Sequence, residues 1–177
     1  MTATEFLAWA ATQPKGRFEL VRGEIIAMAP EKARHSLTKG AAFRALGDAV
    51  RRADLSCTVF PDGMTVVVDD FTAYEPDAVV QCGAPVDLDS TVVPEPMIIV
   101  EVLSLSTQRL DAGGKLADYF RLPSLRHYLL IDAVRRAITH HARSDNGVII
   151  TRIFRDGELN LDPPGLTLPV TGLLINL

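Results

Sequence analysis

The amino-acid sequence predicts an α/β (α+β) fold in which helices flank a mixed central β-sheet. Two segments, 97–103 (MIIVEVL) and 126–132 (RHYLLID), are apolar and rich in β-branched residues on both faces. This pattern is typical of strands that are buried on both sides of a sheet. The predicted elements follow the order helix, hairpin, helix, several strands, helix, strands, and this order places helices on the faces of a sheet.

The first third of the chain predicts two helices on either side of a hairpin. Thr2 followed by Glu5 forms a capping box, which favours a short amphipathic helix. The runs 17–22 and 24–29 are rich in apolar residues and meet at a glycine, which indicates a β-hairpin. A second amphipathic helix is expected over 36–52, with its first residue, a serine, as the cap.

The rest of the chain predicts further strands and one more helix. The strand segments share short runs of β-branched or alternating apolar residues; they are 57–60, 64–69, 77–81, 97–103, 126–132, 136–142 and 147–154. A helix over 110–121 is expected to end before Pro123. The apolar segment 166–177 carries a proline and a glycine, and we expect it to pack as an edge strand or as a subunit contact.

The composition is that of an ordinary globular protein, and its length fits one domain, 1–177. The chain is 47% hydrophobic and 23% charged, with a net charge of −4 that creates no global basic field for nucleic acid. No apolar run is long enough to cross a membrane. Cys57 and Cys82 form neither a CxxC motif nor a disulfide framework, so we expect a reducing cytoplasm as the location.

Two acidic residues are the first candidates for a chemical site. Glu101 lies inside the apolar segment 97–103, where a carboxylate needs a cation, a metal ion or hydrogen-bond donors as a partner. Asp77 begins the segment 77–81. Two adjacent strands can bring one carboxylate each to a single point, where they would share a cation, and hard oxygen ligands suit Mg²⁺. The alternatives are a structural salt bridge for Glu101 and a turn aspartate for Asp77.

Lys115 is the third candidate. It lies on the predicted helix that follows the strand of Glu101, and it shares a helix face with Asp111 and Tyr119. A helix that packs back on this strand could aim the lysine ammonium at the two carboxylates. The alternative is a surface lysine that pairs with Asp111.

Four segments of the chain resemble the Uma endonuclease family, a branch of the PD-(D/E)XK nuclease superfamily. In the order of that family they are RFELVRGEIIAMAP with His35 just after it, YEPDAVV, IIVEVLSLSTQRLDAGGKLADYF and SLRHYLLID. Together they span most of the chain. The resemblance implies a restriction-endonuclease-like core, cleavage of DNA phosphodiester bonds with Mg²⁺ (or Mn²⁺ as a substitute), and a frequent homodimer.

The resemblance also implies roles for individual residues. The positions that match the catalytic and metal-binding motif are Asp77, Glu101 and Lys115, with Glu19 as a further metal ligand, and His35 matches a recurrent histidine to which the resemblance gives no role. We take His35 and Tyr119, which shares a helix face with Lys115, as candidates for substrate contacts. The carboxylates would hold the metal, which lowers the pKa of a bound water. Lys115 would orient that water or stabilise the charge that develops on the phosphate.

One departure from the family pattern lies directly before the lysine. Gly113 and Gly114 stand where a bulkier, often charged residue is expected, and each destabilises a helix by about 1 kcal/mol relative to alanine. The first alternative function is therefore a degenerate family member that binds DNA or a partner protein without cleavage. The second is a glycosidase, which 6% aromatic residues and the single Trp9 do not favour.

Overall fold

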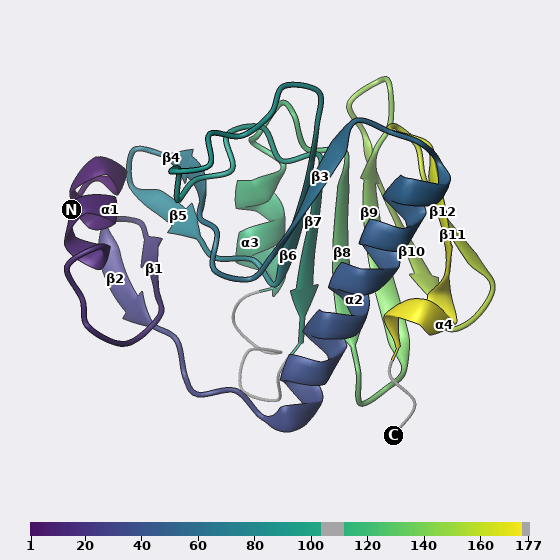
Figure 1. The fold of residues 1–177 in the computed structure, drawn as a ribbon, viewed down its shortest axis with the longest axis horizontal. Helices are drawn as coiled ribbons and strands as arrows, with labels where there is room; N and C mark the ends of the chain where they lie inside the picture. The colour runs from purple at the N-terminus through teal and green to yellow at the C-terminus, as the bar shows by residue number, and fades with distance from the viewer. Residues whose placement is uncertain (104–111, 175–177) are drawn as a thin grey trace.

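The computed structural model describes residues 1–103 and 112–174, and it confirms the predicted fold class of a mixed sheet with helices on its faces (Figure 1). The central sheet has the strand order β10-β9-β8-β7-β6-β3. Its strands are β3 (Cys57–Pro61), β6 (Ala78–Cys82), β7 (Ile98–Val102), β8 (His127–Asp132), β9 (Ala137–Arg143) and β10 (Ile149–Phe154). Neighbouring strands are antiparallel except β7 and β8, which are parallel.

Two helices cover opposite faces of the central sheet. α2 (Ala33–Arg52) crosses one face (Figure 1) and packs on a core that includes Val100 of β7. α3 (Ala112–Tyr119) packs on the other face, in a core that includes Ile99. Because successive side chains of a strand point to opposite faces, Glu101 lies on the face of α3. Residues 110 and 111 of the predicted helix lie outside the described residues.

A smaller sheet with the order β2-β1-β5-β4 packs beside α3 and α1. Its elements are β1 (Phe18–Val21), β2 (Glu24–Ala27), β4 (Val66–Asp69) and β5 (Thr72–Tyr74), preceded in the chain by α1 (Ala3–Ala10). The predicted hairpin and the predicted capping box are both confirmed, since Thr2 and Glu5 exchange hydrogen bonds at the start of α1. The sequence analysis missed β5, which has three residues.

The predicted start of the second helix is wrong. α2 begins at Ala33, with Lys32 as an N-cap that makes no side-chain hydrogen bond, and Ser36 lies inside the first turn. The first turns are instead held by tertiary contacts, because His35 and Lys39 reach from α2 to residues at the ends of β6 and β7. The contacts of His35 and Lys39 with the sheet therefore stabilise the start of α2 in place of the expected side-chain cap.

The C-terminal segment packs inside this chain. β11 (Glu158–Leu161) pairs with β12 (Leu166–Pro169), and α4 (Val170–Leu173) follows. The apolar residues of this segment are buried in the same core as α2; they are Leu166, Leu168, Val170, Leu173 and Leu174. The predicted edge strand exists as β12, but it pairs with β11, and these apolar side chains are not available for a subunit contact.

The two cysteines correct one prediction. Cys57 and Cys82 lie opposite each other on β3 and β6 and form a disulfide, with Cα atoms 3.9 Å apart. The sequence did not predict this disulfide, because the cysteines are separated by 25 positions and only the pairing of β3 with β6 brings them together. The cysteines therefore no longer support the expected reducing compartment. Within 1–103 and 112–174, no helix has the length and apolar character that crossing a membrane requires.

Candidate active site

Asp77 and Glu101 come from neighbouring strands. In the β6–β7 pair, Ala78 lies opposite Val100. Asp77 directly precedes β6, and it is close enough to Glu101 of β7 for its negative charge to raise the pKa of Glu101. The Asp77 N–H donates to the Val100 carbonyl at 3.0 Å, and the Val102 N–H donates to the Asp77 carboxylate at 2.7 Å. Asp77 is thus fixed to the backbone on both sides of Glu101 and is not a free turn aspartate.

Lys115 reaches the same place from α3. Its Nζ lies 2.8 Å from Glu19 Oε1 and 3.0 Å from Glu101 Oε1. The hydroxyl of Tyr119, one helical turn later, donates to the same oxygen of Glu101 at 2.9 Å. We call Glu19, Glu101, Lys115 and Tyr119 the Lys115 cluster. Lys115 is 8% exposed, so the alternative of a surface lysine is wrong.

Burial governs the charges of the Lys115 cluster. It raises the pKa of both Glu19 and Glu101 above their ordinary value of 4.5, although the Lys115 ammonium opposes this shift. Burial also disfavours the charged form of Lys115, but the charges of Glu101 and Glu19 outweigh it and raise the pKa of the lysine. Burial raises the pKa of Asp77 as well. Two carboxyl groups contact one fixed ammonium, with the Asp77 carboxyl group nearby, and the site can accept further positive charge.

Aromatic side chains hold α3 in position. The ring of Tyr119 lies 5.2 Å from the rings of both Tyr74 and Tyr128, measured between centroids. The Tyr74 hydroxyl donates to Asp118 at 2.6 Å, and Lys115 Nζ lies 4.9 Å from the centre of the Tyr74 ring. Tyr119 has no exposed surface. Its hydroxyl therefore contacts Glu101 from within the core, and the expected substrate contact of Tyr119 stays a prediction.

A second buried lysine, Lys39 of α2, lies on the other side of Asp77. Its Nζ pairs with Glu31, lies 2.6 Å from Asp62 Oδ2 and lies 3.5 Å from Asp77 Oδ1. Arg17 pairs with the same two acids, at 2.6 Å from Glu31 and 2.9 Å from Asp62. We call Arg17, Glu31, Lys39 and Asp62 the Lys39 cluster. The sequence analysis did not identify this cluster.

The pKa values of the two acids in the Lys39 cluster, Glu31 and Asp62, shift in the opposite direction. Their side chains are 26% exposed for Glu31 and 36% exposed for Asp62. Partial burial would raise the pKa of each, but the hydrogen bond from Lys39 and the positive charges around them outweigh it, and both pKa values are lowered. The Lys39 cluster therefore stabilises Glu31 and Asp62 in their charged forms.

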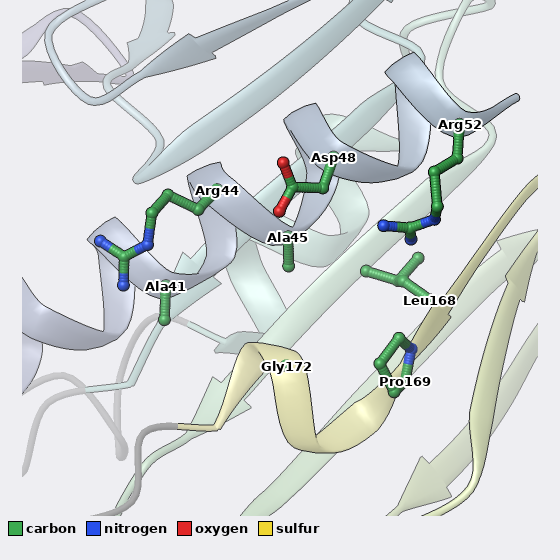
Figure 2. Close-up of a pocket in the computed structure, with 8 residues that line it drawn as sticks. All are labelled: Ala41, Arg44, Ala45, Asp48, Arg52, Leu168, Pro169 and Gly172. Carbon is green, nitrogen blue, oxygen red and sulfur yellow. The ribbon is translucent and has the colours of Figure 1, made fainter. Parts of the chain in front are cut away.

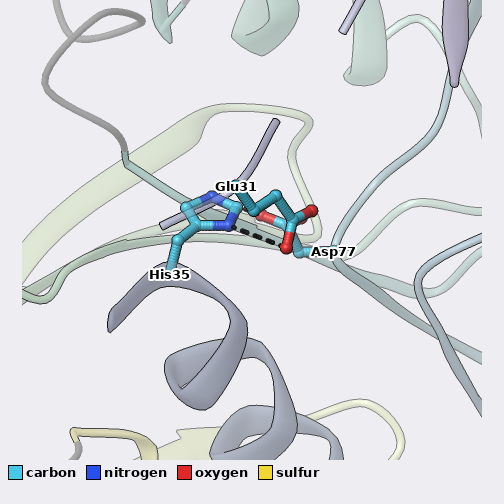
Figure 3. A group of neighbouring side chains, drawn as sticks. All are labelled: Glu31, His35 and Asp77. Atoms are coloured by element: carbon cyan, nitrogen blue, oxygen red, sulfur yellow. Dashed lines mark ion pairs between the residues drawn. The ribbon is translucent and has the colours of Figure 1, made fainter. Parts of the chain in front are cut away.

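His35 lies between the two clusters, in the first turn of α2. Its Nε2 is 2.8 Å from the Val102 carbonyl and 3.6 Å from Asp77 Oδ2. Its Nδ1 is 3.6 Å from Glu31 Oε2, is shielded from solvent and has no hydrogen-bond partner. Figure 3 shows Glu31, His35 and Asp77 pointing toward one another, and one ligand atom from each lies within 4.8 Å of the others.

The charges around Asp77 fit a divalent cation. The acidic side chains in these contacts are Glu19, Glu31, Asp62, Glu75, Asp77 and Glu101, and the basic ones that carry a permanent charge are Arg17, Lys39 and Lys115. Carboxylates in this excess attract a hard cation such as Mg²⁺. Two ligand sets are available, the predicted set around Glu101 and the group of Glu31, His35 and Asp77, and Asp77 belongs to both.

A shallow pocket lies elsewhere on the molecule, between α2 and α4 (Figure 2). Its lining residues are Ala41, Arg44, Ala45, Asp48, Arg52, Leu168, Pro169 and Gly172. No residue of the Lys115 cluster or the Lys39 cluster lines it. Its charged side chains, Arg44, Asp48 and Arg52, are exposed, as expected for the solvated face of a helix. We therefore do not assign this pocket to the chemical site.

Comparison with known proteins agrees with the geometry. The model of the Uma2 family, described as "Putative restriction endonuclease", matches residues 3–171. Two proteins of Synechocystis sp. are similar over most of their length. The "Uncharacterized protein slr1290" is 29% identical, with 96% of this chain and 89% of the relative covered. The "Uncharacterized protein sll1609" is 30% identical, with 87% of this chain and 88% of the relative covered.

A solved structure shares the fold. A crystal structure from Anabaena variabilis, described as a putative nuclease belonging to DUF820, superposes with a TM-score of 0.77 at 17% sequence identity. The match covers 98% of this chain and 97% of the other. The predicted restriction-endonuclease-like core is therefore confirmed as a fold.

Proposed function

Since this chain belongs to the Uma2 family, we propose that it is a metal-dependent nuclease that hydrolyses phosphodiester bonds of DNA. Family and fold support a nuclease with a nucleic-acid substrate. One observation supports the assignment of this activity to specific residues. Asp77, directly before β6, is buried and interacts electrostatically with Glu101 of β7, and the ammonium of Lys115 is 3.0 Å from Glu101.

Asp77 and Glu101, with Glu19, are the proposed ligands of the cation. Their hard oxygen atoms suit Mg²⁺, with Mn²⁺ as a substitute. When bound, such an ion lowers the pKa of a water molecule and offsets charge on the phosphate. The hydrogen bond from the Val102 N–H orients the Asp77 carboxylate for this role. Lys115 and Tyr119 bond the same oxygen of Glu101 and so fix that carboxylate.

Lys115 is the proposed donor to the reacting groups. The charges of Glu101 and Glu19 keep its ammonium protonated throughout the neutral range, since they raise its pKa against the effect of burial. A fixed, desolvated donor can orient a water molecule or stabilise the negative charge that develops on a phosphate. Because Glu19 also holds Lys115, the lysine keeps a carboxylate partner if Glu101 turns toward a cation.

DNA cleavage by the full chain tests the proposal. Supercoiled plasmid and short single-stranded and double-stranded oligonucleotides are incubated with wild type, Glu101→Gln, Lys115→Met and the exposed-lysine control Lys15→Met, in Mg²⁺ or in Mn²⁺. We expect cleavage by wild type and by the control, and a loss of at least about 100-fold in the other two variants. Equal cleavage by wild type and Glu101→Gln would overturn the assignment of the site.

The rival function is a family member that binds DNA or protein without cleaving it. The Glu101–Lys115 ion pair supports this rival if its role is that of a structural salt bridge. Such a protein would cleave none of these substrates in either metal and would bind no Mg²⁺ at Asp77 and Glu101. Isothermal titration of the chelator-treated protein with Mg²⁺ therefore separates the two functions.

The proposal includes a homodimer, because two active sites related by a twofold axis suit cleavage of both strands of a duplex. Its support is the family resemblance, since the described apolar residues of the C-terminal segment are buried within the chain. Light scattering should give twice the mass of 19.3 kDa at micromolar concentration. A single-chain mass at high concentration would remove the dimer and leave the catalytic proposal intact.

A further inference from the structure

The hydrogen bonding of His35 leaves one ring nitrogen without a partner. A carbonyl oxygen only accepts hydrogen bonds, so the 2.8 Å contact with Val102 requires the hydrogen on Nε2. In the neutral ring, Nδ1 then carries a lone pair. This buried atom has no hydrogen-bond partner and faces the carboxylate of Glu31 at 3.6 Å. Two acceptors that face each other repel unless a proton on Nδ1 or a metal cation lies between them.

The same bonding is what a metal-binding histidine uses. A histidine that ligates a metal donates its other ring N–H to a carboxylate or to a backbone carbonyl, which fixes the tautomer and the ring orientation. His35 makes this contact with Val102, a residue of the buried strand β7. The ring is therefore held with Nδ1 ready for a ligand.

Glu31 and Asp77 complete the set of donors. Oε1 of Glu31 pairs with Arg17 and Lys39, whereas Oε2 is the oxygen that faces His35. One oxygen of Glu31, one oxygen of Asp77 and one ring nitrogen of His35 lie within 4.8 Å of one another (Figure 3). Neighbouring ligands of a cation with bonds of about 2.1 Å lie about 3 Å apart, so small side-chain movements are sufficient.

We propose that Glu31, His35 and Asp77 form a second divalent-cation site, selective for a first-row transition metal over Mg²⁺. Imidazole nitrogen suits transition metals, whereas Mg²⁺ prefers oxygen ligands and retains its water molecules. Asp77 is shared with the proposed Mg²⁺ site, so the two ions would lie side by side. A role of this ion in cleavage rests on the proposed function, but its binding does not.

Mn²⁺ is the probe for this site, because its paramagnetic resonance reports both binding and the chemical nature of its ligands. The chelator-treated full chain is titrated with Mn²⁺ in a large excess of Mg²⁺, and spin-echo modulation of the bound ion is recorded. We expect wild type to retain one Mn²⁺ per chain with a nitrogen coupling from imidazole. Glu31→Gln and His35→Gln should bind Mn²⁺ at least about tenfold more weakly, and His35→Gln should lose the nitrogen coupling.

Two further variants serve as controls. Glu24→Gln removes one exposed carboxylate from β2 and should bind Mn²⁺ as wild type does. Glu101→Gln should keep the nitrogen-coupled Mn²⁺ while DNA cleavage is lost. If wild type retains nitrogen-coupled Mn²⁺ but cleaves no DNA, the nuclease proposal fails and the second site stands.

Three outcomes would overturn the second site. Wild type could retain no Mn²⁺ in excess Mg²⁺, Glu31→Gln could bind Mn²⁺ with unchanged affinity, or the nitrogen coupling could persist in folded His35→Gln. Glu31 is partly exposed, and Arg17 and Lys39 keep Asp62 as a partner when its charge is removed. The Glu31→Gln result therefore decides the question even if His35→Gln does not fold.

Discussion

The molecule contains two buried lysines, each surrounded by carboxylates, and they differ in how deeply their partners are buried. The partners of Lys115, Glu19 and Glu101, have side chains that are 9% and 14% exposed. Two partners of Lys39, Glu31 and Asp62, are 26% and 36% exposed, and a third, Asp77, is 4% exposed and lies between the two lysines' clusters. Burial raises the pKa of the first pair, whereas in the second pair the hydrogen bonds and charges of Lys39 and Arg17 lower it.

Burial therefore disfavours the charged forms of Glu19 and Glu101, whereas the charged forms of Glu31 and Asp62 are stabilised. Partial exposure and two cations, Arg17 and Lys39, stabilise the charged forms of Glu31 and Asp62. Around Lys115, one ammonium serves two desolvated carboxyl groups, with Asp77 beside them. The Lys115 cluster becomes more stable when it gains a proton or a metal ion, and that property is expected of a functional site.

Replacing each lysine should produce the largest contrast. Lys115→Met leaves Glu19 and Glu101 buried without their cation and should destabilise the protein by about 3–5 kcal/mol. Lys39→Met should cost about 1 kcal/mol, because Arg17 still pairs with both half-exposed acids. Urea unfolding in the presence of a chelator measures both, with Lys15→Met as the exposed control. Equal losses in the two variants would remove the distinction between the clusters.

The dependence of stability on pH should have opposite signs for the two clusters. The folded-state pKa of Glu101 is raised above 4.5, so its contribution is present below that pH and is lost as the pH rises through the raised value. The folded-state pKa of Glu31 is lowered, so its contribution is present above 4.5 and is lost as the pH falls through the lowered value.

Matched amide variants measure these two contributions. As the pH rises from 4 to 8, Glu101→Gln should gain free energy of unfolding relative to wild type, because Glu19 still neutralises Lys115. Glu31→Gln should lose free energy of unfolding relative to wild type over the lower part of that range. Chelator-treated protein is unfolded with urea at each pH. Differences of the same sign for both variants would contradict the account.

The glycines before Lys115 should give the smallest effect. Gly113 and Gly114 are exposed within α3, and a Cβ added to either meets no described atom within 4 Å. Alanine at each position should therefore stabilise the protein by about 1 kcal/mol through helix propensity alone. Thermal unfolding of each variant measures the gain. A loss of stability in either variant would mean that the helix turn requires glycine.

The sequence predicted the Lys115 cluster better than the Lys39 cluster, for a physical reason. Glu101 is a charged residue in an apolar strand, so its need for a partner is visible in a short segment. Lys39 carries a similar signal, since it falls three residues before Ala42 and seven before Leu46 on the buried face of α2. The signal was missed because charged residues at helix surfaces are common, and its partners lie in distant loops.

Long-range pairing limited the prediction of the fold in the same way. The strands β7 and β8 were predicted because their residues are apolar on both faces. Sheet register, however, decides that Cys57 lies opposite Cys82, and no local pattern encodes that register. Elements with local signals were therefore predicted, whereas contacts between distant segments required the structure.

Thermal unfolding of wild type and Asp77→Asn, with and without Mg²⁺, tests most directly whether the Asp77–Glu101 pair is a metal site. Asparagine can still accept the Val102 hydrogen bond and removes a charge that burial disfavours. The metal-free variant should therefore melt at the wild-type temperature or higher. Mg²⁺ at one hundred times its dissociation constant should stabilise wild type by about 2.7 kcal/mol and the variant much less. Strong destabilisation of Asp77→Asn, with no response of either protein to Mg²⁺, would contradict the metal site.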